Sequence, residues 1–271
     1  MGKVTTTPDF QNIVIDIGGL PVIVRTADPA FLGLLGNRYA GFLGSSEHAE
    51  FEFDVELTPP GTVGAEDDLR VFQRAGRWSA ERGDFRAEWN PTSNRGSIRQ
   101  SANPYSIDAV LRIIHTLVLS RQGGFLVHAA SAVRNGRAFL FAGVSGAGKT
   151  TMARLAPEEA ILLSDEISYV KRQEGGYSAF GTPFTGELAK VGKNICAPIA
   201  ALYLLAKGTK NRIEAVTQVK ASRALLANIL FFAEDAELVR LVFQSACEFV
   251  DRIPVYRLTF VPDASVWEMI A

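Results

Sequence analysis

A glycine-rich motif in the middle of the chain constrains its fold more than any other feature: residues 143–150 read Gly-Val-Ser-Gly-Ala-Gly-Lys-Thr. The motif matches the pattern Gly-x-x-x-x-Gly-Lys-[Ser/Thr], and it stands between an apolar strand expected at residues 138–143 and a short helix expected from Lys149. Glycines let successive backbone N–H groups approach phosphate oxygens closely, and a helix N-terminus adds the positive end of its dipole. The motif therefore predicts a phosphate-binding loop (P-loop), and the alternative is an ordinary glycine-rich turn.

The P-loop pattern assigns roles to its residues. Lys149 supplies a mobile positive charge for the β- and γ-phosphates of a nucleotide, and the Thr150 hydroxyl is the expected Mg²⁺ ligand. The predicted cofactors are ATP and Mg²⁺. We expect the nucleotide to be contacted by Gly143, Ser145, Gly146, Ala147, Gly148, Lys149, Thr150 and Thr151.

Two adjacent carboxylates, Asp165 and Glu166, follow an apolar strand expected at residues 161–165, and Asp165 stands 16 residues after Lys149. Because one short helix separates this strand from the P-loop, we expect both carboxylates beside the Mg²⁺ and the γ-phosphate. Adjacent residues on a strand point to opposite faces, which favours different roles. One carboxylate can hold Mg²⁺ while the other accepts the proton of an attacking hydroxyl. The alternative is a solvated strand end.

A histidine, His128, is brought to the P-loop by strand register. Asn135 and Gly136 are a strong signal for a two-residue hairpin turn between strands expected at residues 125–133 and 138–143. In that register His128 lies opposite Gly143, where an imidazole can contact phosphate or orient a carboxylate. The alternative is a core histidine with satisfied hydrogen bonds. We expect His115, by contrast, to face solvent.

The loop at residues 181–187 is a further candidate, because it follows a strand and contains two glycines and a proline. Such a loop suits a substrate-side or lid segment. Glu187 and Lys190 are its residues most able to reach phosphate or metal. The same composition also suits a simple connection.

The hydrophobic pattern divides the chain into two domains, residues 1–105 and 106–271. The first shows short stretches of alternating polarity and predicts an antiparallel β-rich region. A helical pattern with one apolar face then begins at Ser106, which we expect to be its N-cap, and apolar strands and helices follow. The predicted fold class is α/β, with a β-rich N-terminal region followed by a domain that carries the P-loop.

Charge and length exclude several classes of protein. The net charge of -1 predicts no nucleic-acid partner and no anionic membrane partner. No apolar stretch approaches the roughly 18 residues of a membrane span. Two cysteines are too few for a secreted disulfide framework, so we expect a cytoplasmic protein. The sequence leaves the oligomeric state open, a homo-oligomer included.

One segment resembles the HPr kinase/phosphorylase family. It runs from His128 through a hairpin and the P-loop to Asp165 and Glu166. It looks most like the related serine kinases of peptide-modification systems, which share their core with phosphoenolpyruvate carboxykinase. The resemblance implies that residues 106–271 form a P-loop kinase domain of the HPr kinase/phosphoenolpyruvate carboxykinase type. The resemblance implies that Asp165, His128 and Lys149 are catalytic and that Thr150, Glu166 and Asp165 surround the metal. It further implies that Asp165 takes the proton, and it puts Glu where the family has a second Asp.

Motifs and resemblance together predict an ATP-dependent kinase that transfers the γ-phosphate to a hydroxyl, with a serine of a peptide or protein as its partner. One alternative is a small-molecule kinase. The other is a nucleotide-binding regulatory protein without turnover, which would need Lys149 and Thr150 but not Asp165, Glu166 and His128 at the same phosphate. The sequence does not name the acceptor.

Overall fold

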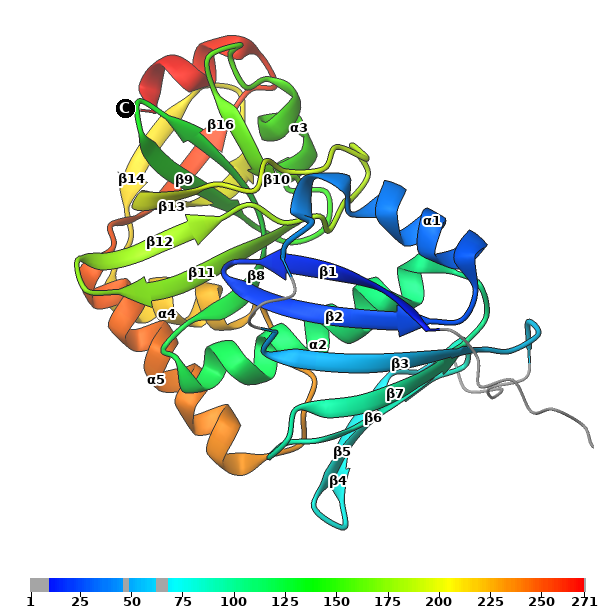
Figure 1. Cartoon of the computed structure of the whole chain (residues 1–271). Helices are drawn as coiled ribbons and strands as arrows, with labels where there is room; N and C mark the ends of the chain where they lie inside the picture. Colours follow the sequence, from blue (N-terminus) through cyan, green and yellow to red (C-terminus); the bar gives the residue numbers. More distant parts are fainter. Residues whose placement is uncertain (1–9, 46–48, 62–67, 271) are drawn as a thin grey trace, which may run out of the picture. The chain divides into compact units, whose positions relative to one another are not determined.

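The structure is a computed structural model, and it describes residues 10–45, 49–61 and 68–270 (Figure 1). The chain forms two compact units, Met1–Leu111 and Arg112–Ala271. The division falls inside the long helix α2, Pro104–Arg121, which the sequence analysis assigned to the second domain.

The first unit contains a seven-stranded sheet with the order β1-β2-β3-β7-β6-β5-β4. Its elements are β1 (Gln11–Ile17), β2 (Leu20–Thr26), α1 (Pro29–Arg38), the short 3-10 helix η1 (Ala40–Phe42), β3 (Phe51–Leu57), β4 (Arg70–Arg74), β5 (Arg77–Arg82), β6 (Phe85–Asn90) and β7 (Arg95–Gln100). Along β2 every second residue is buried, as the alternation of apolar and polar residues predicts.

The expectation that this sheet is wholly antiparallel is wrong, because β3 runs parallel to both β2 and β7. A parallel pair needs a crossover connection. Between β2 and β3 that connection contains α1, which the sequence analysis did not predict. Asp28 caps α1 by accepting the N–H of Phe31 at 2.9 Å, and Pro29 is its first residue.

Helix α2 begins two residues before the expected start, with the Asn103 side chain accepting the N–H of Tyr105 at 3.0 Å. Ser106 is therefore not the N-cap; it lies inside the helix and donates to Asp84 at 2.8 Å. The expectation for His115 is also wrong, because His115 is 0% exposed. The helix is buried over nearly its whole circumference, so a single apolar face did not identify its buried side chains.

The second unit contains a nine-stranded sheet in which strands of both directions meet. Its elements after α2 are β8 (Phe125–Arg134), β9 (Arg137–Ala142), α3 (Lys149–Arg154), β10 (Ile161–Ser164), β11 (Ile167–Gln173), β12 (Gly176–Phe180), β13 (Cys196–Lys207), β14 (Arg212–Ala215), α4 (Gln218–Leu226), β15 (Ile229–Leu230), α5 (Ala236–Arg252), β16 (Val255–Phe260) and the 3-10 helix η3 (Ala264–Met269). Strand β8 is central: its first half pairs with β11 and β15, and its second half with β9 and β10.

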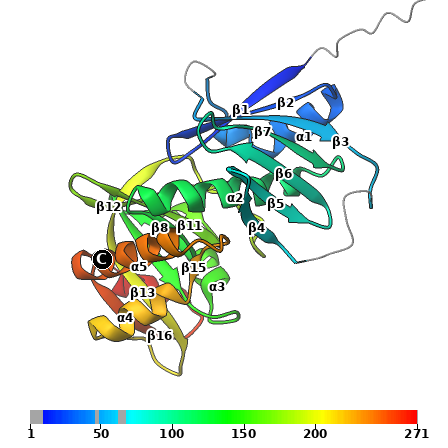
Figure 2. The same ribbon diagram turned by 90° about the horizontal axis from the view of Figure 1, so that it is seen from below.

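Helices cover both faces of this second sheet. On one face Leu225 of α4 and Phe249 of α5 pack against Leu140 and other strand residues, and Figure 2 shows the two helices side by side. On the other face Met152 of α3 and Trp267 of η3 pack against the neighbouring β9 residue Phe141. Both faces of the strands are therefore apolar, which explains why β8 and β9 read as continuous apolar runs.

The predicted fold class is wrong. The described residues form two mixed sheets with sixteen strands and few helices, so the chain is mostly β and shows no clear P-loop α/β kinase architecture. An α/β crossover would place the strand after α3 parallel to β9. That strand, β10, instead pairs antiparallel with β8, and α3 has only six residues. The sequence analysis read each element locally and did not anticipate these pairings.

The hairpin predicted at Asn135 and Gly136 is confirmed. Arg134 pairs with Arg137 across Asn135 and Gly136, and the register continues to the pair Ala129 and Ala142. The β11–β12 hairpin likewise closes at Gln173 and Gly176. None of the helices in the described part of the chain is long and apolar enough to cross a membrane.

Candidate functional site

A cavity of about 250 Å³ in the second unit gathers most of the residues that the sequence analysis singled out. It is lined by His128, Ser145, Gly146, Gly148, Lys149, Thr150, Thr151, Asp165, Glu166, Gly186, Glu187 and Lys207. These residues come from five places in the chain: β8, the P-loop with the start of α3, the turn after β10, the loop after β12, and the end of β13. Lysines and carboxylates therefore face the same small space.

The P-loop turns tightly at Gly148, the residue before α3. Its φ of 114° is rarely adopted by a residue with a side chain, and a Cβ there would lie 2.5 Å from the ring of Phe260. No side chain caps α3 at this residue, so its first N–H groups remain available to a ligand. Two predicted contact residues do not line the cavity: Ala147 is buried beneath the loop, and Gly143 contributes its carbonyl to a contact with Lys149.

Lys149 is held against its own loop. Its Nζ donates to the carbonyl oxygen of Gly143 at 2.8 Å and to that of Val144 at 3.4 Å. The side chain is mostly buried, and this burial lowers the pKa of Lys149 from its ordinary value, although Glu166 and Glu187 act in the opposite direction. A charge that is poorly solvated and held only by carbonyls is well placed to exchange them for a phosphate.

The two carboxylates differ in their surroundings, although not through the alternation of strand faces: β10 ends at Ser164, so Asp165 and Glu166 both lie in the turn before β11, and both line the cavity. Asp165 is 2% exposed, and its two oxygens accept the N–H groups of Gly186 at 2.9 Å and Leu188 at 3.1 Å. Burial raises the pKa of Asp165 above its ordinary value in spite of these hydrogen bonds. Glu166 keeps a partly exposed carboxylate that reaches toward His128. Asp165 is thus the better proton acceptor, and Glu166 the more accessible ligand.

His128 lies where strand register predicted it, one residue before the last registered pair of β8 and β9. It also pairs with Ile167 of β11, which directly follows Glu166. Its Nε2 stands 3.7 Å from Oε1 of Glu166. Burial and the nearby positive charge of Lys149 lower the pKa of His128, so the contact joins a neutral imidazole to a carboxylate at neutral pH.

The oxygen atoms of this site suit Mg²⁺, which usually takes one or two carboxylates together with phosphate oxygens and waters. Asp165, Glu166 and the Thr150 hydroxyl can supply such a set. Within residues 10–45, 49–61 and 68–270, no group of three or more His, Cys, Asp or Glu residues could hold a metal by itself.

Lys207 is the lining residue that the sequence analysis missed. Strands β9 and β13 run parallel with Ala142 beside Leu204, so the end of β13 with Lys207 lies at the edge of the sheet where the P-loop follows β9. Lys207 is exposed and makes no ion pair in the described part of the chain. No local sequence pattern predicts this pairing of distant strands. Of the two candidates in the loop after β12, Glu187 lines the cavity and the exposed Lys190 does not.

A family model matches residues 98–271, which is more than half of the chain and includes every residue that lines the cavity. Its description is SynChlorMet cassette protein ScmC. The chain belongs to the ScmC family. This finding corrects the resemblance to the HPr kinase/phosphorylase family, because the matching model describes ScmC and not that family. None of the curated proteins matches the chain.

Proposed function

We propose that the second unit binds the phosphate groups of ATP together with Mg²⁺ and transfers the γ-phosphoryl group to a hydroxyl, that of a serine in a polypeptide. The observation that carries this proposal is the single cavity where Lys149 and Thr150 of the P-loop meet Asp165 and Glu166. The lysine suits phosphate oxygens, and the carboxylates suit a metal and a proton.

The size of the cavity supports a site for phosphates rather than for a whole nucleotide. Its volume of about 250 Å³ is below the roughly 300–1,000 Å³ of sites that enclose a complete small molecule. On binding, Lys149 would leave the carbonyls of Gly143 and Val144 and take up phosphate oxygens, and Thr150 and Glu166 would hold the metal. Mg²⁺ supplies charge neutralisation between the phosphates when it is bound. Lys207 adds a second positive charge from the opposite strand.

The position of Asp165 in the cavity supports the following transfer step. The serine oxygen forms a bond to the γ-phosphorus, the bond from that phosphorus to the β–γ bridging oxygen breaks, and ADP leaves with that electron pair. The serine proton moves to the carboxylate of Asp165, whose raised pKa makes it a better base than an exposed aspartate. His128 orients Glu166 through the contact between Nε2 and Oε1.

The family description supports a choice of acceptor to test. It names a cassette protein, and we propose that this chain also acts with polypeptides encoded beside its own gene, in the cytoplasm, where ATP is available. The test incubates the protein with ATP and Mg²⁺ and each of those polypeptides, and reads the mass gain and the modified residue by mass spectrometry.

A Lys149→Ala variant of unchanged melting temperature is the matched control in that test. We expect one phosphate on a serine of at least one polypeptide with the wild-type protein and none with the variant. ATP binding without transfer to any polypeptide would contradict the kinase proposal and favour a regulator. Phosphate that appears only on a small molecule would favour the alternative of a metabolite kinase.

A further inference from the structure

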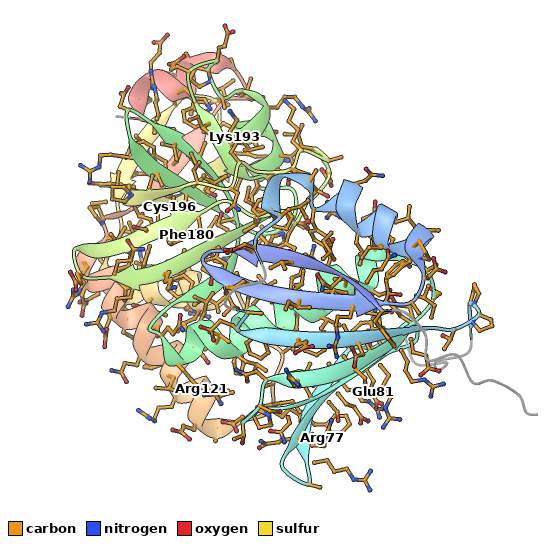
Figure 3. The ribbon with its side chains drawn as sticks, in the orientation of Figure 1. Arg77, Glu81, Arg121, Phe180, Lys193 and Cys196 are labelled. Atoms are coloured by element: carbon orange, nitrogen blue, oxygen red, sulfur yellow. The ribbon has the colours of Figure 1, made fainter. Side chains whose placement is uncertain are left out.

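The connection between β12 and β13 contains a compact loop, residues 182–192, whose two ends are joined. The N–H of Gly192 donates to the carbonyl of Thr182 at 3.1 Å, which closes the loop. Both ends are also attached to β10, because Thr182 donates to the carbonyl of Leu163 at 2.9 Å and Lys193 to that of Leu162 at 3.0 Å. Lys193 is labelled in Figure 3, where the loop passes beside β10.

The inner side of this loop is built into the candidate site. Asp165 accepts the N–H groups of Gly186 and Leu188, and Glu187 stands 3.5 Å from the Thr150 hydroxyl. The base of the loop is anchored by Phe184, which is 1% exposed and lies under the guanidinium group of Arg112, 4.9 Å from the ring centroid. The loop therefore cannot move without disturbing the carboxylate that would accept the proton.

The outer side of the loop faces solvent. Val191 is 44% exposed, and Ala189 and Lys190 are exposed as well. Ala189 has a φ of 52°, a left-handed conformation that costs an alanine on the order of 1 kcal/mol. The chain thus maintains a strained turn and an exposed apolar side chain within four residues of Glu187, which lines the cavity. We call residues 189–191 the acceptor rim.

We propose that the acceptor rim binds the acceptor polypeptide, with Val191 in contact with an apolar side chain near the serine. This inference rests on the proposed function. A small acceptor would need a pocket that buries about 70–90% of its surface, and the cavity of about 250 Å³ has room for little beyond the phosphates. An extended chain can instead be recognised on an exposed surface beside the carboxylate, as the rim offers.

The rim also sets the spacing of the recognised side chain. Leu188 is bonded to Asp165, and Val191 follows three residues later. Three residues of chain reach at most about 10 Å. A serine whose hydroxyl meets Asp165 therefore places Val191 within reach of side chains one to three residues away along an extended acceptor.

The experiment uses a positional-scanning library of short peptides with one fixed serine, labelled with [γ-³²P]ATP and Mg²⁺. It compares the wild-type protein with Val191→Asp and with the control Ile195→Asp. Ile195 is a similarly exposed apolar residue, 39% exposed, just outside the loop. Melting temperatures measured beforehand verify that both variants fold. For the wild type we expect roughly tenfold more label on peptides with an apolar residue at one position within three of the serine.

Val191→Asp should replace that preference by one for lysine or arginine at the same position, because a carboxylate then faces the acceptor. Ile195→Asp should keep the wild-type preference. A Val191→Asp variant with the wild-type preference, or a wild type without any positional preference, overturns the role of the rim and leaves the kinase proposal standing. Absence of label from the wild type, with ATP bound, overturns both.

Discussion

His115 provides a test of the structure that is independent of any function. Its side chain is fully buried in α2, and its ring meets that of Tyr169 edge to face at a centroid distance of 5.3 Å. Neither ring nitrogen has a hydrogen-bond partner among the described residues. Burial, with a smaller contribution from the positive charge of Lys171, lowers the pKa of His115 from 6.5 to about 3. The imidazole is therefore neutral in the native protein at pH 5.

The pKa values determine the size and the sign of the effect. In the unfolded chain the histidine has its ordinary pKa, about 6.5, and takes up a proton at pH 5, which the native protein does not. Stability is fully present above pH 6.5 and is lost as the pH falls toward the folded pKa. Between pH 7.5 and pH 5 the loss from this one side chain is about 2 kcal/mol, the product of 1.5 pH units and 1.36 kcal/mol.

The variant His115→Leu removes both the titration and the unsatisfied ring nitrogens. Relief of the buried polar atoms is worth about 1–3 kcal/mol, and loss of the ring contact costs about 0.5–1.5 kcal/mol. We expect the variant to be more stable than wild type by about 1 kcal/mol at pH 7.5 and about 3 kcal/mol at pH 5. Urea denaturation at the two pH values measures both differences in the free energy of unfolding. Because wild type and variant contain the same carboxylates, the pH dependence that these carboxylates contribute cancels in the difference. An equal difference at both pH values would refute the reasoning.

Three further predictions concern the site and one turn. Lys149→Met should lower ATP affinity by about tenfold or more, while the melting temperature stays level or rises because the substitution removes a buried charge. Isothermal titration measures the affinity and thermal denaturation the melting temperature, and a large drop in melting temperature would contradict this. Asp165→Asn should lower kcat of transfer about 10²–10⁴-fold, whereas Glu166→Gln should mainly raise the Mg²⁺ concentration for half-maximal rate, and kinetics over a Mg²⁺ series separate the two. Ala75→Asn should stabilise the β4–β5 turn by about 0.5–1 kcal/mol, since Ala75 has a φ of 49° where the equivalent turn has Asn135 at 51°; unchanged stability in denaturant would count against it.

Much of the candidate site could be predicted from short stretches of sequence. The residues of the P-loop are contiguous, so its glycines and Lys149 need only a strand before them and a helix after them. The position of His128 followed from the Asn135-Gly136 turn, because a two-residue hairpin sets the register of every residue in both strands. The local sequence was sufficient for the prediction wherever a single turn connects the two strands that carry the site residues.

Pairing of distant strands could not be predicted in this way. Lys207 reaches the cavity because β13 runs parallel to β9, with more than fifty residues between the two strands. The parallel pairing of β3 with β7 escaped prediction for the same reason. Buried polar residues were missed too: the period of α2 identified one apolar face, and His115 is buried outside it. Burial of such a residue depends on what packs around the helix, which its own sequence does not contain.

The same contrast explains how the fold class could be wrong while the P-loop, both carboxylates and His128 still line one cavity. These residues constrain only the ends of three strands. His128 is three residues from the start of β8, the P-loop directly follows β9, and Asp165 and Glu166 directly follow β10. An α/β crossover and the observed antiparallel pairing of β10 with β8 both bring the end of β10 to this edge. The same residues can thus meet at one edge of a sheet in different strand topologies. A motif therefore predicts the chemistry of a site more reliably than it predicts the fold.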